Sequence, residues 1–187
     1  MTRIIAGAAG GVRLEVPAAG TRPTSDRVRE SLFGALETTG LLDATTVLDL
    51  YAGSGALGLE ALSRGAAVVD LVEKAPRAAA IARGNAERVA KAAGRTARVH
   101  QSAVQAFLAT ARGPYDLVLL DPPYDLPAAT VTDDLRALAP LLAPDAIVVV
   151  ERATRSGAPD WAAAGLVPLR DRAYGDTTLW WGEPPPR

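Results

Sequence analysis

The most informative absences in this chain are cysteine and clustered histidine. Its 187 residues include no cysteine and a single histidine, His100. A chain without thiols forms no disulfide, no thiolate metal site and no cysteine nucleophile, and one histidine does not make a multi-histidine metal site. We therefore expect chemistry that needs no metal ion.

Long hydrophobic runs are also missing. No window approaches the roughly 18 uninterrupted apolar residues of a membrane helix, and residues 1–5 lack the features of a signal peptide. The hydrophobic fraction of 49% is nevertheless ample for the core of one domain. These features predict a cytoplasmic protein with no membrane partner. Because no dimerisation segment is evident, we expect a monomer.

Charge is distributed unevenly along the chain. Residues 1–30 contain five arginines and three acidic residues, whereas the whole chain has a net charge of −1. A locally basic N-terminus suits nucleic-acid phosphates. From charge alone, however, we favour a solvated surface of mixed sign.

From residue 46 onward, short apolar runs alternate with helix-like stretches. The predicted strands are 46–51, 67–72, 97–100, 115–120 and 145–150, and the predicted helices are 56–64, 76–93, 103–111 and 128–142. Continuous apolar strands joined by helices predict a parallel sheet that is covered on both faces. Residues 165–171 and 174–181 predict a C-terminal antiparallel hairpin, because almost nothing separates them. This α/β pattern, seven strands and mostly parallel, is typical of the Rossmann-like fold of class I S-adenosylmethionine-dependent methyltransferases.

A smaller unit precedes this pattern. Residues 3–6 and 12–16 flank a glycine-rich turn and predict a small N-terminal β-hairpin. A helix at about 25–38 follows, with Thr24 or Ser25 as its cap. We expect a hairpin extension at 1–23, a methyltransferase domain at 24–183 and a flexible tail at 184–187.

A glycine-rich loop lies where strand 46–51 leads into a helix. Gly53 and Gly55 let the backbone turn sharply and approach a ligand, and the helix beyond offers free N–H groups. Glu73 ends the next strand, where a carboxylate accepts hydrogen bonds from both ribose hydroxyls. With Gly58, the spacing also matches dinucleotide-binding proteins, and a tight structural turn is a third interpretation. Asp49 favours a cofactor with a cationic methionine group, because this carboxylate would repel a pyrophosphate.

The most specific motif is Asp121-Pro122-Pro123-Tyr124, directly after strand 115–120. A residue before proline is kept out of the α region, so Asp121 stays extended at the sheet edge where such folds bind ligands. The prolines remove two N–H donors and leave only acceptors. The Asp121 carboxylate and the Pro122 carbonyl can accept both hydrogens of an exocyclic amine on a nucleic-acid base. Tyr124 can stack on that base once it is flipped out.

Holding both amine hydrogens in acceptors favours a pyramidal nitrogen whose lone pair points at the electrophile. Orientation and electrostatic stabilisation would then suffice for direct methyl transfer. The competing interpretation is an ordinary loop with a core tyrosine. The position of the tetrad after the fourth strand of this fold favours the catalytic interpretation.

The chain resembles the bacterial 16S rRNA (guanine-N2)-methyltransferases, which modify a hairpin-loop guanine of the small ribosomal subunit. The resemblance covers nearly the whole chain, and its motifs lie at residues 3–7, 11–14, 21–24, 29–33, 47–55 and 121–124. It implies S-adenosylmethionine as the cofactor and 16S rRNA or the small ribosomal subunit as the partner.

The resemblance also implies roles for single residues. The implied cofactor-binding residues are Asp49, Gly53, Gly55, Glu73 and, with them, Ser102 and Thr24. The implied catalytic residues are Asp121, Pro122 and Tyr124, and the implied substrate-binding residues are Pro123, Tyr124, Arg3, Arg13 and Arg22. Ser102 departs from the pattern, because many related enzymes carry an aspartate for the adenine there. A serine makes a weaker hydrogen bond than that carboxylate.

Other functions stay open at this point. The tetrad serves any conjugated amine, so an N6-adenine methyltransferase acting on RNA or DNA is the nearest alternative. A nicotinamide-dependent oxidoreductase would explain the glycine loop but not the tetrad. A non-catalytic RNA-binding module would leave the tetrad without a purpose.

Overall fold

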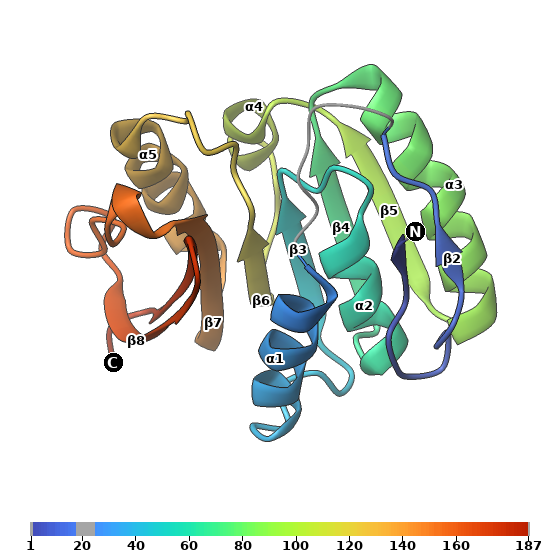
Figure 1. The fold of residues 1–187 in the computed structure, drawn as a ribbon. Helices are drawn as coiled ribbons and strands as arrows, with labels where there is room; N and C mark the ends of the chain where they lie inside the picture. The colour runs from blue at the N-terminus through green and yellow to red at the C-terminus, as the bar shows by residue number, and fades with distance from the viewer. Residues whose placement is uncertain (1, 18–24, 187) are drawn as a thin grey trace.

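The computed structural model describes residues 2–17 and 25–186, and its centre is a seven-stranded sheet (Figure 1). The strand order is β5-β4-β3-β6-β7-β9-β8. The first five strands in this order are parallel, and β9 runs antiparallel to both of its neighbours. The elements are α1 (Asp26–Glu37), β3 (Thr46–Leu50), α2 (Ala56–Arg64), β4 (Val68–Glu73), α3 (Pro76–Ala93), β5 (Thr96–Gln101), α4 (Val104–Leu108), β6 (Tyr115–Leu120), α5 (Ala128–Leu138), β7 (Leu142–Ala153), β8 (Val167–Tyr174) and β9 (Thr177–Glu183).

Two hydrophobic cores lie on opposite faces of the sheet. Helices α1, α2 and α3 cover one face, and α4, α5 and residues 157–166 cover the other (Figure 1). Successive residues of a strand point to opposite faces, so Leu117 and Leu119 enter the first core, whereas Val118 and Leu120 enter the second. The central strands β4, β3 and β6 are buried on both faces, as their continuous apolar sequences predict, whereas the edge strand β8 is largely exposed. The predicted class I methyltransferase fold is confirmed.

The direction of strand addition reverses between β3 and β6. From β3 the chain adds β4 and β5 on one side, and it then returns to add β6 and β7 on the other. The loops that leave β3 and β6 therefore diverge at their carboxyl ends. Open α/β sheets bind ligands in the crevice at such a point.

Several element boundaries differ from the prediction by a few residues, and the largest difference is at the end of the helix predicted at 128–142. The helix predicted at 128–142 ends at Leu138, and a 3-10 turn at Ala139–Leu141 follows. Pro140 explains this end, since proline lacks an N–H and disfavours helical geometry in the residue before it. Strand β7 is longer than predicted and spans Leu142–Ala153. No helix in residues 2–17 and 25–186 is long and apolar enough to cross a membrane.

The N-terminal hairpin packs onto α2. Its strands, β1 (Thr2–Arg3) and β2 (Arg13–Leu14), are antiparallel, and Ile4 between them is fully buried. The buried Glu60 carboxylate accepts the N–H groups of Ile5 and Ala6 at 2.8 and 3.1 Å. Gly7 adopts a φ of +84°, and a Cβ there would lie 2.1 Å from the Ser63 carbonyl oxygen. The hairpin therefore rests on the half of α2 that is farther from the glycine loop.

Candidate active site

Four adjacent strands bring the glycine loop, Glu73, Ser102 and the tetrad to one edge of the sheet. Leu50 of β3 pairs with Val72 of β4 and with Leu120 of β6, so the next residue in each strand leaves at the same level. The Asp121 N–H donates to the Leu50 carbonyl at 3.4 Å. This bond places the start of the tetrad beside the start of the glycine loop.

The glycine loop is held from several sides. The Gly53 N–H donates to the Glu73 carboxylate at 2.9 Å, and the Ala75 N–H donates to its other oxygen at 2.7 Å. Gly55 begins α2 with a φ of +82°, a left-handed conformation that favours glycine. A Cβ on Gly58 would lie 2.5 Å from Leu71 Cδ2 and 2.8 Å from Val69 Cγ1, so a larger residue here would force these side chains of β4 to move. The Glu73 side chain is thus already oriented at the position predicted for ribose recognition.

Asp49 is a buried carboxylate with one oxygen unused. The residue is 1% exposed. Its Oδ2 accepts the Gly58 N–H at 2.8 Å, whereas its Oδ1 has no hydrogen-bond partner among the described residues. Burial raises the pKa of Asp49 to about 7; the Gly58 N–H opposes this shift and the Glu73 charge adds to it. A cationic group beside Oδ1 would satisfy this oxygen and favour the ionised form. These residues therefore fit the predicted cofactor, whose methionine moiety carries an ammonium group.

Ser102 follows β5 and lies next to Glu73. Its N–H donates to the Glu73 carbonyl at 3.1 Å, and its hydroxyl donates to the Ala103 carbonyl at 3.0 Å. A hydroxyl oxygen that donates one bond still accepts others. The arrangement is compatible with the predicted hydrogen bond from an adenine amine, and the role itself stays a prediction.

The second half of the tetrad is more exposed than the first half. Asp121 is partly buried and Pro122 is buried, whereas Pro123 and Tyr124 are exposed. The Pro123 carbonyl accepts the Leu126 N–H at 2.9 Å, which closes a turn after the tetrad. Tyr124 is 42% exposed, and its hydroxyl lies 3.1 Å from Thr177 Oγ1 of β9. The interpretation of Tyr124 as a core tyrosine is therefore wrong.

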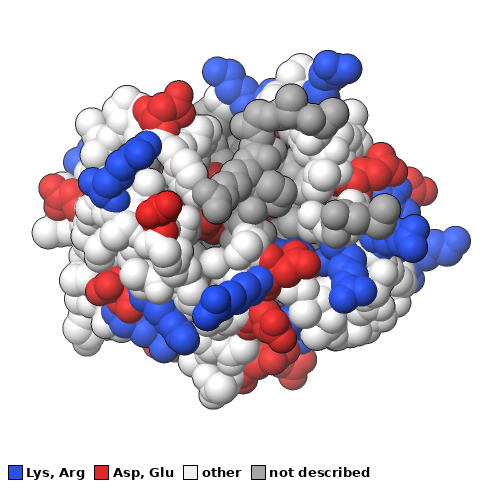
Figure 2. Space-filling model, viewed as in Figure 1, with Lys and Arg blue, Asp and Glu red and all other residues white. Residues whose placement is uncertain are grey.

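Two of the predicted RNA-binding arginines, Arg3 and Arg13, lie away from this edge, on the N-terminal hairpin. Arg3 and Arg13 are exposed and face each other across the N-terminal hairpin. With Gly11 and Asp26 they line a hollow of about 410 Å³. On the face shown in Figure 2, basic and acidic groups are interspersed, as the mixed-charge interpretation expects. The predicted roles of Arg22 and Thr24 fall outside the described residues.

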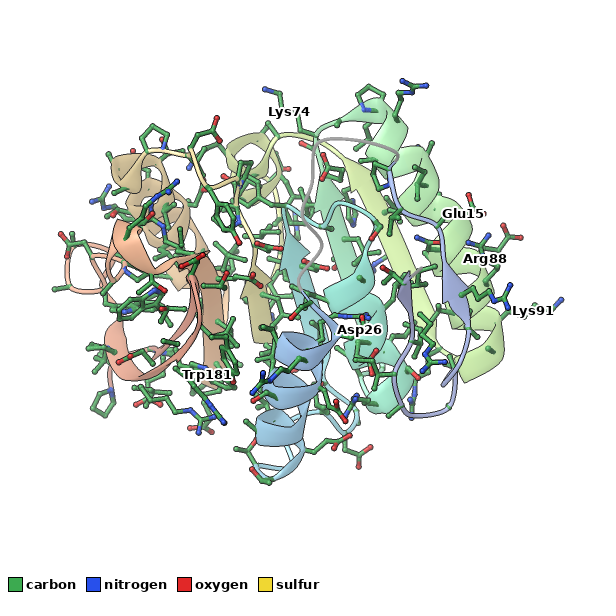
Figure 3. All side chains as sticks on the ribbon, in the orientation of Figure 1. Glu15, Asp26, Lys74, Arg88, Lys91 and Trp181 are labelled. Atoms are coloured by element: carbon green, nitrogen blue, oxygen red, sulfur yellow. The ribbon has the colours of Figure 1, made fainter. Side chains whose placement is uncertain are left out.

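Sequence reasoning missed two buried polar residues around the glycine loop. Asn85 of α3 is fully buried; its amide donates to the Ser54 and Glu15 carbonyls at 2.8 and 2.9 Å and accepts the Glu15 N–H at 2.9 Å. Arg88, one turn later, lies 3.3 Å from the Glu15 carboxylate (Figure 3). Asp134 of α5, also fully buried, accepts a hydrogen bond from Tyr51 of the loop. In both cases the signal in the sequence was a polar residue at a buried helix position, Asn85 in α3 and Asp134 in α5.

A family model described as Conserved hypothetical protein 95 matches residues 2–183, which include both the hairpin and the tetrad. The chain belongs to this family. Ribosomal RNA small subunit methyltransferase D of Escherichia coli (strain K12) is 40% identical over 158 residues, which are 84% of this chain and 77% of that protein.

Two further relatives cover nearly the whole chain. Putative rRNA methyltransferase YlbH of Bacillus subtilis is 32% identical over 179 residues, 94% of this chain and 95% of that protein. The solved structure of a putative methyltransferase from Escherichia coli, yhhF, has a TM-score of 0.84 and 33% identity, and covers 99% of this chain and 98% of that one. The predicted family resemblance is confirmed, and the chain is a methyltransferase.

Proposed function

We propose that this protein transfers the methyl group of S-adenosylmethionine to the N2 amine of a guanine in small-subunit rRNA. The observation that carries the proposal is the Asp121–Tyr124 tetrad, which sits beside the glycine loop at the point where strand addition reverses. The similarity to an rRNA small subunit methyltransferase over most of the chain supports the choice of substrate.

The cofactor site comprises the Asp49 carboxylate, the glycine loop and Glu73. Asp49 Oδ1 meets the ammonium group of the methionine moiety, and Glu73 accepts hydrogen bonds from the ribose hydroxyls. Ser102, next to Glu73, accepts one from the adenine amine. When bound, S-adenosylmethionine would supply an electrophilic methyl group, which passes to the amine nitrogen as its bond to the sulfonium sulfur breaks and leaves S-adenosylhomocysteine. Thr24 is assigned to the same site from the family motif alone.

The tetrad orients and activates the target amine. The Asp121 carboxylate and the Pro122 carbonyl accept its two N–H bonds, which withdraws the lone pair from conjugation with the base. As the nitrogen–carbon bond forms, the nitrogen becomes positive, and the Asp121 carboxylate stabilises this charge. The proton that the nitrogen loses passes to Asp121 and from there to solvent. Pro123 and Tyr124 hold the flipped base, with the exposed Tyr124 ring stacked on it.

The N-terminal hairpin provides a second contact with RNA. Like charges directly opposite each other in an antiparallel pair are unfavourable, and Arg3 opposes Arg13 in this way. A phosphate between the two guanidinium groups removes the repulsion, and the hollow beside them has room for it. We assign this hollow, together with Arg22, to the RNA backbone.

The rival functions account for fewer of these observations. An N6-adenine methyltransferase would use the same tetrad, but it does not explain why the family match includes the N-terminal hairpin. A nicotinamide-dependent oxidoreductase requires no tetrad and has no support from the family. A non-catalytic RNA-binding module would not explain why a carboxylate, that of Asp49, is buried beside the glycine loop.

One experiment separates these functions. Purified protein is incubated with methyl-labelled S-adenosylmethionine and, separately, with small subunits lacking the modification, free 16S rRNA and DNA, followed by nucleoside analysis. We expect label in N2-methylguanosine from one of the two ribosomal substrates. Label only in N6-methyladenosine would refute the guanine assignment, and no label in any arm would refute methyl transfer to nucleic acid.

A further inference from the structure

The glycine loop contains a residue whose backbone is unusual for its side chain. Tyr51, directly after β3, has a φ of +62°, and the other non-glycine residue with positive φ among those described is Ala44. L-residues with a Cβ rarely adopt this conformation, and they keep it only where the surroundings impose it. Since Gly53 and Gly55 follow at once, the conformation of Tyr51 sets the direction in which the loop leaves the sheet.

A buried carboxylate fixes the Tyr51 side chain. The Tyr51 hydroxyl donates to Asp134 Oδ2 at 2.5 Å, and Gln105 Nε2 donates to Asp134 Oδ1. Asp134 is fully buried on α5, and burial raises its pKa, although the two hydrogen bonds act in the opposite direction. Burial and the adjacent Asp134 likewise raise the pKa of Tyr51. The hydrogen bond between the Tyr51 hydroxyl and the Asp134 carboxylate therefore holds both side chains in place.

The three residues come from three different segments of the site. Tyr51 belongs to the cofactor loop after β3, Gln105 to α4, which follows the Ser102 segment, and Asp134 to α5, which follows the tetrad loop. One carboxylate therefore fastens together the segments that follow β3, β5 and β6. None of the three is needed for the chemistry of methyl transfer proposed above.

We propose that Asp134 is a positioning residue that holds Tyr51, and through it the cofactor loop, in the binding conformation before the cofactor arrives. The inference rests on the proposed cofactor site and adds a determinant of its affinity. A loop that is already ordered binds with its intrinsic affinity, whereas a loop that is ordered only part of the time binds more weakly in proportion. The Tyr51–Asp134 bond therefore acts on cofactor binding rather than on the methyl-transfer step.

The test compares two matched tyrosine substitutions. Tyr51→Phe removes a hydroxyl that donates to a buried carboxylate beside the site. Tyr115→Phe removes one that donates to the buried Asp70 at 3.2 Å, from the first residue of β6, at the opposite edge of the sheet. Both changes keep the aromatic ring, and both lower stability by losing one such bond. Only the first acts on the cofactor loop.

Calorimetric titration with S-adenosylhomocysteine and steady-state kinetics give the readout. We expect Tyr51→Phe to raise the Kd and the KM for S-adenosylmethionine about fivefold or more, with little change in kcat. Tyr115→Phe should lower Tm and leave the Kd within about twofold. Asp134→Ala should reproduce Tyr51→Phe, and Asp134→Asn, which keeps an acceptor for the phenol, should restore most of the affinity.

The outcomes distinguish this inference from the function on which it rests. Wild-type affinity in Tyr51→Phe, or an equal loss in Tyr115→Phe, overturns the positioning role and leaves the proposed function intact. Failure of the wild-type protein to bind S-adenosylhomocysteine overturns the cofactor site and the inference together.

Discussion

The two sides of the candidate site are built differently. On the cofactor side, the loop after β3 is held by hydrogen bonds from Gly53 to Glu73, from Asn85 to Ser54 and from Tyr51 to Asp134. On the substrate side, Pro123 and Tyr124 of the tetrad are exposed, and the Tyr124 hydroxyl contacts Thr177 of β9.

This difference follows from the size of the two ligands. A small cofactor offers few contacts, so its site must be ordered before binding to avoid an entropic cost. A folded RNA has a large surface and brings contacts of its own, including those assigned to the N-terminal hairpin. We therefore expect substitutions on the substrate side to affect turnover or RNA recognition, and those on the cofactor side to affect affinity for the small molecule.

The largest effect should come from Asp121→Ala. Removing the acceptor that orients the amine and stabilises its developing charge should lower kcat about 10²- to 10³-fold. The Kd for S-adenosylhomocysteine should stay near the wild-type value, because Asp49 and Glu73 are unchanged. Asp125→Ala, an exposed aspartate of the same loop, is the matched control and should retain activity. Unchanged turnover in Asp121→Ala would refute the proposed role of the tetrad.

Tyr124→Ala should have the next largest effect. Loss of stacking on the flipped base should raise the KM for rRNA about tenfold, with cofactor binding unchanged. Tyr124→Phe keeps the ring and loses only the exposed contact with Thr177, so it should stay within about threefold of the wild type. Equal defects in the two variants would show that the hydroxyl, rather than stacking, matters.

On the cofactor side, the affinity for the cofactor product should depend on pH. The pKa of Asp49 is raised to about 7 by burial, so the free protein takes up a proton here as the pH falls from about 8 to about 6. A bound ammonium group favours the ionised carboxylate, so affinity for S-adenosylhomocysteine should be about tenfold lower at about pH 6 than at about pH 8. Calorimetry in buffers of different ionisation enthalpy would detect the released proton.

The same shift has an opposite consequence for the stability of the free protein. A carboxyl group whose pKa is raised on folding favours the folded state at low pH, and this contribution is lost as the pH rises through about 7.

Two substitutions test the assignment of Asp49. Asp49→Asn should abolish the pH dependence of cofactor binding, whereas Asp43→Asn, at an exposed position, should preserve it. An affinity that does not vary with pH in the wild-type protein would contradict the assignment of Asp49.

Short-range patterns carried most of the correct predictions. The apolar strands fixed the sheet, and the loop starting points at Gly53 and Asp121 followed from residues that are adjacent in the chain. Ser25 caps α1, one of the two predicted caps, by accepting the Val28 N–H at 3.3 Å. In each case a few neighbouring residues decide the local conformation, so one sequence is sufficient.

The contacts that support these loops were not predictable in the same way. Tyr51 and Asp134 are 83 positions apart, Glu15 and Asn85 are 70 apart, and Tyr124 and Thr177 are 53 apart. No periodicity links such partners, because their proximity depends on how the completed sheet brings its edges together. A buried polar residue in a helix signals that a partner exists, but the sequence alone does not identify it.

The position of β9 has a consequence for synthesis of the chain. Although β9 follows both β7 and β8 in the chain, it lies between them in the sheet and pairs with both. A nascent chain that stops before Thr177 leaves two strand edges without their shared neighbour, and such edges invite association with other chains. Early termination therefore removes an interior strand, so the sheet is completed only after translation has passed residue 183.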